Sequence, residues 1–387
     1  MKKIYLDHNA TTPLDPMILE AMLPYYRDVF GNASSVHEFG RLARKGIDEA
    51  RAKVASLLGA KDVDEVVFTG SGTESDNFAI KGAADNLKAK GNHIITSSIE
   101  HHAVLNTCKF LEQNGYKVTY LKTDKFGIVD LNELKDSITD KTILISIMYA
   151  NNEIGTIEPV SDISKIAKEK DVLFHTDAVQ ATGKVPMNAS KLGADLISLS
   201  AHKFYGPKGV GALFIKKGVK LTRLLHGGHH EKNRRGGTEN VAGIVGLGKA
   251  AELASKNMSE SQTRIKALRD KLHNGITENI KHTYLNGHPE NRLCNTVNIS
   301  FEYLEGESII LNLDMEGVGV STGSACTSGS LEPSHVLTSM GVSPVRAQGS
   351  IRFSLGKDNN EEDIDYVIKA LPPIIDRLRK MSPLYKG

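Results

Sequence analysis

The sequence predicts an α/β fold in which a large domain with a mainly parallel sheet is joined to a smaller α+β domain. Between residues 60 and 215, short apolar runs rich in β-branched residues alternate with longer amphipathic stretches, as in βαβ units. Beyond residue 279 this alternation stops and short strand patterns predominate. At 387 residues the chain is longer than one ordinary core, so two domains are expected.

The expected strands of the large domain are short and apolar, as buried strands are. They cover residues 65–69, 93–96, 118–121, 143–148, 172–175, 196–199 and 211–215. Helical stretches between them include 73–90, 103–114 and 161–170. Ligands of such sheets collect at the carboxyl ends of the strands, so functional residues are expected there.

The second half of the chain begins with a long helical stretch at 243–279. Strands are expected at 296–300, 318–321 and 350–354, and a closing helix at 361–380. We place the boundary near residue 258. The large domain is then 14–258, and the small domain comprises 1–13 and 259–387.

Composition excludes several classes of function. The formal net charge is only +2, which argues against nucleic acid as a partner. No apolar segment is long enough to span a membrane, and the N-terminus lacks a signal core. Three widely spaced cysteines fit a reducing compartment, so a cytoplasmic protein is expected.

Lys203 follows the expected strand at 196–199, within Ser200-Ala201-His202-Lys203. A lysine at a strand end, beside a hydroxyl and an imidazole, suits a Schiff base to a phosphorylated aldehyde such as pyridoxal phosphate (PLP). The alternative is a solvated loop lysine.

Two further strand ends favour the cofactor over that alternative. Asp177 follows the strand at 172–175, and a carboxylate there can pair with the protonated ring nitrogen of PLP. A helix N-cap is the alternative role for Asp177. Residues 70–75, with Gly72 and Thr73, open a helix whose backbone N–H groups can approach a phosphate.

Motifs along nearly the whole chain, from Tyr5 to about Ile375, resemble those of cysteine desulfurases of the NifS/IscS type. These are class V aminotransferase-like, fold type I PLP enzymes. The motifs lie at residues 6–12, 72–75, 151–155, 177–180, 200–209 and 235–240. The resemblance implies conversion of L-cysteine to L-alanine by a homodimer. Its sulfur acceptor would be an iron–sulfur scaffold protein of the IscU/NifU type or a tRNA-thiolation protein.

The resemblance also implies roles for individual residues. Lys203 would bind the cofactor and shuttle the Cα proton, Asp177 would pair with the ring nitrogen, and His101 would stack on the ring. A simple helix-start role is the alternative for His101. The other cofactor contacts would come from Gly72, Thr73, Asn152, Gln180, Ser200 and His202, with Thr238 reaching in from a second subunit.

Cys326 lies in a run of small and polar residues at 322–333, which is typical of a mobile, exposed loop. By resemblance it is the sulfur carrier; a small residue in a turn is the alternative. Cys108 and Cys294 are expected to be packing residues.

Arg352 is the residue that the resemblance assigns to the substrate carboxylate, because guanidinium matches that group with two parallel donors. An exposed strand arginine is the alternative. Asn32 and Asn152 would assist in binding the substrate. No resident metal is expected, although Cys326 could serve as a transient cluster ligand.

Two rival functions remain open at this stage. One is a PLP aminotransferase or lyase of the same fold without a sulfur carrier. The other is an inactive partner protein with a relic site. Dependence on Cys326 separates the desulfurase from the first rival, and cofactor absorbance separates it from the second.

Overall fold

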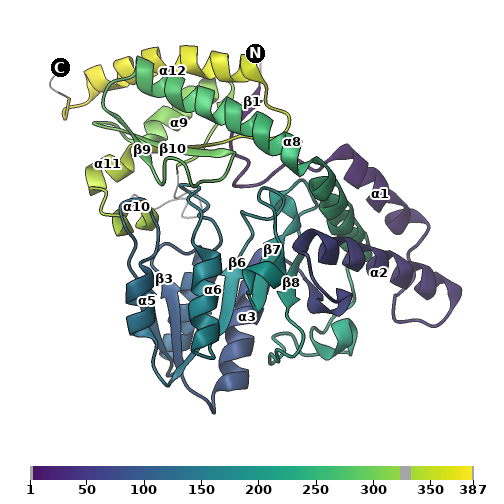
Figure 1. The fold of residues 1–387 in the computed structure, drawn as a ribbon. Helices are drawn as coiled ribbons and strands as arrows, with labels where there is room; N and C mark the ends of the chain where they lie inside the picture. Colours follow the sequence, from purple (N-terminus) through teal and green to yellow (C-terminus); the bar gives the residue numbers. More distant parts are fainter. Residues whose placement is uncertain (1–2, 323–332, 386–387) are drawn as a thin grey trace.

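The computed structural model describes residues 3–322 and 333–385 (Figure 1). A seven-stranded sheet forms the centre of its larger part. The strand order is β2 (Val66–Thr69), β8 (Gly211–Ile215), β7 (Leu196–Ser200), β6 (Leu173–Asp177), β5 (Thr142–Ser146), β3 (His93–Ser97) and β4 (Lys117–Leu121). Strand β8 is antiparallel to β2 and β7, and the other pairs are parallel. The predicted α/β fold with a mainly parallel sheet is confirmed.

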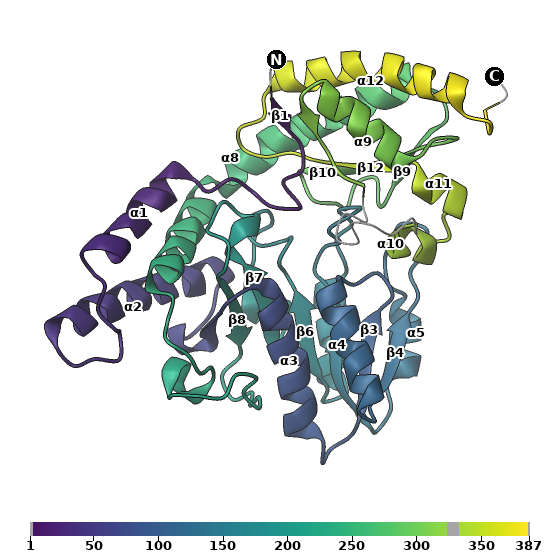
Figure 2. The ribbon, with the colours of Figure 1, turned by 180° about the vertical axis from the view of Figure 1, so that it is seen from behind.

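Helices cover both faces of this sheet. Helices α3 (Gly72–Leu87) and α4 (His102–Gln113) cover the face seen in Figure 2. The opposite face, seen in Figure 1, carries α5 (Leu131–Ser137) and α6 (Val160–Glu169), and the short α7 (Ala189–Leu192) precedes β7. Strands β3, β5, β7 and β8 are buried at every residue, which explains why their apolar residues are not confined to alternate positions.

The smaller part is built on an antiparallel sheet of β9 (Thr283–Asn286), β10 (Thr296–Phe301) and β12 (Ser350–Ser354), with β10 in the middle. Its helices are α9 (Gly306–Met315), α10 (His335–Ser339), α11 (Pro344–Gln348) and α12 (Glu361–Met381). The N-terminal β1 (Ile4–Tyr5) pairs in parallel with β11 (Val318–Gly319). The first strand of the chain is therefore tied to its C-terminal third.

Helix α8 (Val241–Asn279) crosses from one hydrophobic core to the other (Figure 1). Ile244 and Leu247 pack in the core of the large sheet. Leu268 and Leu272 pack in the core of the small sheet. The expected boundary at residue 258 thus falls inside a continuous helix, and the division into two domains stays a prediction.

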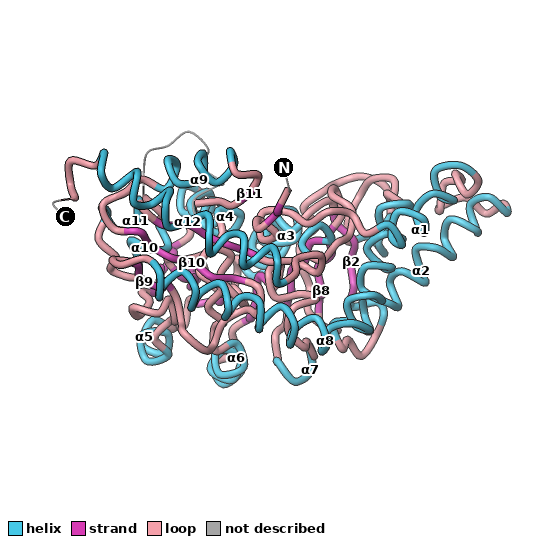
Figure 3. Tube along the Cα trace, turned by 90° about the horizontal axis from the view of Figure 1, so that it is seen from above, coloured by secondary structure: helices cyan, strands magenta, loops and turns pink. Residues whose placement is uncertain are grey.

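Two helices near the N-terminus were not expected from the sequence. Helices α1 (Pro16–Arg27) and α2 (Glu38–Leu58) pack on α8 and extend away from the sheet (Figure 3). Asp15 caps α1 by accepting from the Met17 backbone N–H, and Gly59 ends α2 in the left-handed conformation.

Short 3-10 turns complete the fold at η1 (Val63–Glu65), η2 (Ala201–Lys203) and η3 (His230–Asn233). In the portion of the chain that is described, none of the helices has both the length and the apolar character of a membrane span.

Candidate active site

A cavity of about 300 Å³ lies where β6 and β7 end, between the large sheet and β12. Ten of the residues predicted for the site line it. They are Gly72, Thr73, His101, Asn152, Asp177, Gln180, Ser200, His202, Lys203 and Arg352. The carboxyl ends of neighbouring parallel strands meet at one edge of a sheet, and this brings together residues that are far apart in sequence.

Lys203 enters the cavity from η2, directly after β7. Its Nζ donates to the backbone carbonyls of Asn9 at 2.6 Å and Ala10 at 2.7 Å. The N-terminal segment therefore holds the amine in place. A half-buried lysine with two carbonyl partners is not a solvated loop lysine.

Asp177 is the last residue of β6 and is buried. Burial raises the pKa of its carboxyl to about 6, although the positive charge of Lys203 acts in the opposite direction. Its Oδ1 accepts from the Val179 backbone N–H at 2.9 Å, so Asp177 also caps the turn that follows. The capping role and the cofactor role are compatible, because the carboxylate has a second oxygen.

The fully buried Asp76 lies beside Asp177 on the wall of the same cavity. Burial and the charge of Asp177 raise the pKa of Asp76 well above its usual range. Within the described residues, Asp76 Oδ1 has no hydrogen-bond partner. The protein thus carries two closely spaced carboxyl groups in a region where negative charge is disfavoured.

The start of α3 provides a cradle for a phosphate. Ser71 caps the helix by accepting from the Glu74 backbone N–H at 3.1 Å. A Cβ on Gly72 would lie 2.8 Å from Val179 Cγ2 and 3.3 Å from Ser200 Cβ, so only glycine leaves this space open. An open helix N-terminus of this kind favours an anion.

Two neutral imidazoles border the cavity. Burial, with a further contribution from the charge of Lys203, lowers the pKa of His101 and of His202 to about 4. His101 is the N-cap of α4, and its Nδ1 accepts from the Ala103 backbone N–H at 3.1 Å. The helix-start role is therefore correct, and it does not exclude a ring contact, because His101 also lines the cavity.

Arg352 comes from the middle of β12 and is only 3% exposed, which excludes an exposed strand arginine. Its Nη2 donates to Asp7 Oδ1 at 2.7 Å, and its Nη1 donates to the Asn152 carbonyl at 3.1 Å. Among the described residues its buried Nε has no partner. The guanidinium is thus fixed in position and still has donor capacity.

This set of groups fits pyridoxal phosphate. Lys203 supplies an amine for its aldehyde, and Asp177 supplies a buried carboxylate for its ring nitrogen. The glycine cradle at Gly72 and the neighbouring Ser200 suit its phosphate. Arg352 provides a separate cationic position for a carboxylate substrate.

Two predicted residues of the described part of the chain are not brought to this cavity. Asn32 and Thr238 are exposed and do not line it. Cys326 lies outside the described residues, so its position is not part of the geometry given above.

Other residues of the site carried no predicted role. Asp7, Asn9 and Ala10 hold Arg352 and Lys203, and Asp76 lies beside Asp177. The polar run at 6–12 was one of the motifs of the family resemblance, and it was the available signal for the first three. Asp76 gave no such signal, because its position four residues into α3 looks like that of any helical aspartate.

Comparison with known proteins gives consistent matches. The aminotransferase class-V family matches residues 4–367. A protein named cysteine desulfurase IscS from Dictyoglomus turgidum is 56% identical, over 99% of this chain and 97% of its own length. A solved structure of a NifS-like protein has a TM-score of 0.92 at 42% identity, covering 97% of this chain and 100% of its own. The structure titled "SspA in complex with cysteine" has a TM-score of 0.82 at 39% identity, covering 92% and 99%.

Proposed function

Because this chain belongs to the class-V aminotransferase family and, within it, to the cysteine desulfurases, we propose that it converts L-cysteine to L-alanine and transfers the sulfur to Cys326. The enzyme depends on pyridoxal phosphate. One observation carries the proposal: the Lys203 amine and the Asp177 carboxylate lie at the ends of adjacent strands, on a cavity that also contains Arg352.

Substrate binding follows from the charges around the cavity. Arg352 is proposed to hold the carboxylate of L-cysteine through guanidinium donors that Asp7 and Asn152 do not use. Lys203 Nζ then lies on the same cavity as the substrate Cα and is proposed to remove and return its proton. When bound, PLP supplies an electron sink that weakens the bonds at Cα and Cβ.

Asp177 and His101 are proposed to maintain the electronic state of the cofactor ring. The buried carboxylate of Asp177 would keep a proton on the ring nitrogen, since an ion pair relieves the unfavourable burial of its charge. His101, neutral at physiological pH, would offer a flat face to the ring without adding positive charge.

The sulfur step is proposed to take place at Cys326. Its thiolate attacks the sulfur of the substrate and forms a new S–S bond. The bond between Cβ and sulfur breaks, its electron pair stays with carbon, and that carbon gains a proton to give alanine. One cysteine and one protein thiol become one alanine and one protein persulfide, so no external oxidant is needed.

A homodimer is proposed as the working form. Large apolar side chains are exposed along α1, α2 and the loop between them. They include Met17 at 57%, Tyr26 at 62%, Phe30 at 70%, Val36 at 88% and Phe39 at 53% exposure. Large apolar side chains that are exposed in such number on neighbouring elements are typical of a protein interface. A dimer would also give roles to Asn32 and Thr238, which do not reach the cavity of their own chain.

The persulfide is proposed to pass to an iron–sulfur scaffold protein of the IscU/NifU type or to a thiolation protein. The name of the Dictyoglomus relative supports the first acceptor. Three widely spaced cysteines suit a reducing compartment, and the cytoplasm is the location we propose.

The deciding experiment is an assay of purified holoenzyme with L-cysteine and a reductant. Alanine and sulfide should form in equal amounts, and without reductant the sulfur should remain on the protein. Lys203→Ala protein should lose bound cofactor and both products together. Formation of a keto acid in place of alanine would contradict the proposal and favour an aminotransferase or another lyase.

A further inference from the structure

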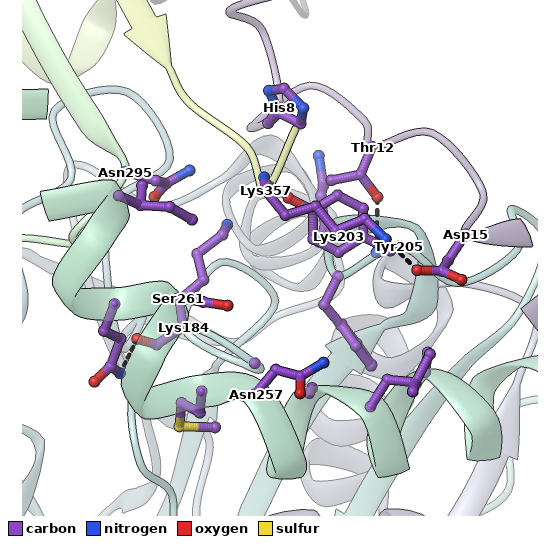
Figure 4. Close-up of a pocket in the computed structure, with 18 of the residues that line it drawn as sticks. His8, Thr12, Asp15, Lys184, Lys203, Tyr205, Asn257, Ser261, Asn295 and Lys357 are labelled. Carbon is purple, nitrogen blue, oxygen red and sulfur yellow. Dashed lines mark hydrogen bonds and ion pairs between the residues drawn. The ribbon is translucent and has the colours of Figure 1, made fainter. Parts of the chain in front are cut away.

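A second cavity adjoins the cofactor cavity at Lys203. It is bounded by the N-terminal segment, by α8 and by the segment around Lys357 (Figure 4). Lys203 lines both cavities, and Lys184 lines only the second one. Figure 4 shows the side chain of Lys184 extending into this space from a loop next to α8.

Lys184 is connected to the cofactor site through one side chain. Its Nζ donates to Gln180 Oε1 at 3.0 Å. Gln180 lines the cofactor cavity and Lys184 does not, so Lys184 contacts Gln180 from outside that cavity. No other hydrogen bond to Gln180 Oε1 is present among the described residues, so Lys184 is its partner in the protein.

The Asn9 backbone carbonyl determines which way the Gln180 amide points. A carbonyl oxygen can only accept, so Nε2 faces Asn9, and Oε1 faces Lys184 and accepts from its amine. Nε2 then donates one hydrogen to the Asn9 carbonyl at 3.0 Å. Its second hydrogen remains for a ligand in the cofactor cavity. Turning the amide round would place the Gln180 carbonyl oxygen against the Asn9 carbonyl oxygen, with no hydrogen between them.

The local backbone fixes Lys184 in this position. Gln180 and Lys184 are four residues apart in a run of turns that brings their side chains together. Gly183 between them has φ +76°, and a Cβ there would lie 2.9 Å from Phe204 Cβ. Gln262 of α8 donates its side-chain N–H to the Lys184 carbonyl.

We propose that Lys184 is a positioning residue of the cofactor site, which holds the Gln180 amide so that Nε2 donates toward an oxygen of the bound cofactor. This inference rests on the proposed contact between Gln180 and the cofactor. Lys184 acts through Gln180 and need not touch cofactor or substrate.

The test is a double-mutant cycle on cofactor binding. Apoenzyme of wild type, Lys184→Met, Gln180→Ala and the double variant is titrated with pyridoxal phosphate, and the absorption spectrum of the bound cofactor is recorded across pH. Lys184→Met should raise the dissociation constant about 5- to 30-fold, as expected for one misdirected polar contact. It should shift the spectrum in the same direction as Gln180→Ala. The double variant should be no weaker than Gln180→Ala alone.

Two further variants separate positioning from general damage. Lys184→Arg keeps a donor at the same place and should restore most of the affinity and the wild-type spectrum. Lys357→Met removes another lysine from the same second cavity and should change neither. Thermal unfolding of each apoprotein verifies that the variants fold.

The outcomes distinguish this inference from the proposed function. If Gln180→Ala weakens the cofactor while Lys184→Met does not, or if the two effects are additive, the positioning role of Lys184 is overturned. If Gln180→Ala itself has no effect, the proposed Gln180 contact fails, and the role of Lys184 fails with it.

Discussion

Arg352 Nη2 donates to Asp7 Oδ1 at 2.7 Å, which joins the middle of β12 to the segment that follows β1. The two residues are far apart in sequence, and the guanidinium is almost completely buried. The pair therefore orients Arg352 before a substrate arrives. This preorganisation reduces the entropy that binding must overcome.

Arg352→Ala should lower kcat/KM for L-cysteine by roughly 30- to 1,000-fold, the range expected for loss of a charged bidentate contact. Bound cofactor should remain, because Arg352 is assigned to the substrate carboxylate. Arg352→Lys keeps the charge but loses the paired donors, so it should recover only part of the activity. Steady-state kinetics with a cofactor absorbance measurement check both points. An unchanged kcat/KM in Arg352→Ala would move the carboxylate contact to another residue.

Asp177→Asn should make the apoprotein more stable at pH 8 by about 1–3 kcal/mol. The folded-state pKa of Asp177 is raised to about 6, so the folded protein binds this proton more tightly than the unfolded chain. Stability is therefore lost as pH rises from about 4 through 6, and the full penalty is present above that range. Asparagine cannot ionise and avoids the penalty.

Urea unfolding of the apoproteins at pH 8 and pH 5 measures this difference, which should shrink at the lower pH. Asp162→Asn, at an exposed position on α6, is the control and should show no such dependence. Equal stability of wild type and Asp177→Asn at pH 8 would mean that the carboxylate has no cost in the apoprotein. Asp177→Asn should still bind the cofactor but should convert L-cysteine much more slowly than wild type.

Much of the large sheet could be predicted because its strands are buried along their whole length. The run expected at 211–215 matches β8 residue for residue, and that at 196–199 differs from β7 by one residue. Direction was harder to predict, because an antiparallel β8 shows the same continuous apolar pattern as its parallel neighbours. Helices α1 and α2 were missed, although Asp15-Pro16 and Gly59 were usable start and stop signals.

The candidate site could be predicted where a residue lies at the end of a strand or directly after it, as Asp177 and Lys203 do. Partners that come from distant segments could not, because nothing local in the sequence specifies them. Most strands of the large sheet lie between Asn9 and Lys203 in the sequence. Asn9 accepts through its backbone carbonyl, so the type of residue at this position does not reveal the contact. The pairing of Arg352 with Asp7 likewise depends on β1 joining the small part of the molecule.

Phe30→Asp combined with Phe39→Asp should convert a dimer into a monomer. Both rings are exposed at the α1–α2 end of the molecule, and their centroids lie 5.6 Å apart. Two carboxylates placed in an apolar interface would have to be desolvated without partners, which is costly. Sedimentation velocity checks the mass. Met315→Asp changes an equally exposed side chain on α9 and should leave the mass unchanged. A wild type that already sediments as a fully active monomer would contradict the shared interface.

Cys326→Ser should still bind L-cysteine and shift the cofactor spectrum, yet sulfide production should collapse, because a serine hydroxyl cannot attack sulfur effectively or store it. The other two thiols are poor substitutes. Burial raises the pKa of Cys108 to about 12, and it also raises the pKa of Cys294, so neither is a thiolate at neutral pH. Wild type given L-cysteine without reductant should gain the mass of one sulfur atom on the peptide that contains Cys326. Cys294→Ser is the matched control and should keep both turnover and the mass gain. Undiminished alanine and sulfide production by Cys326→Ser would overturn the persulfide mechanism.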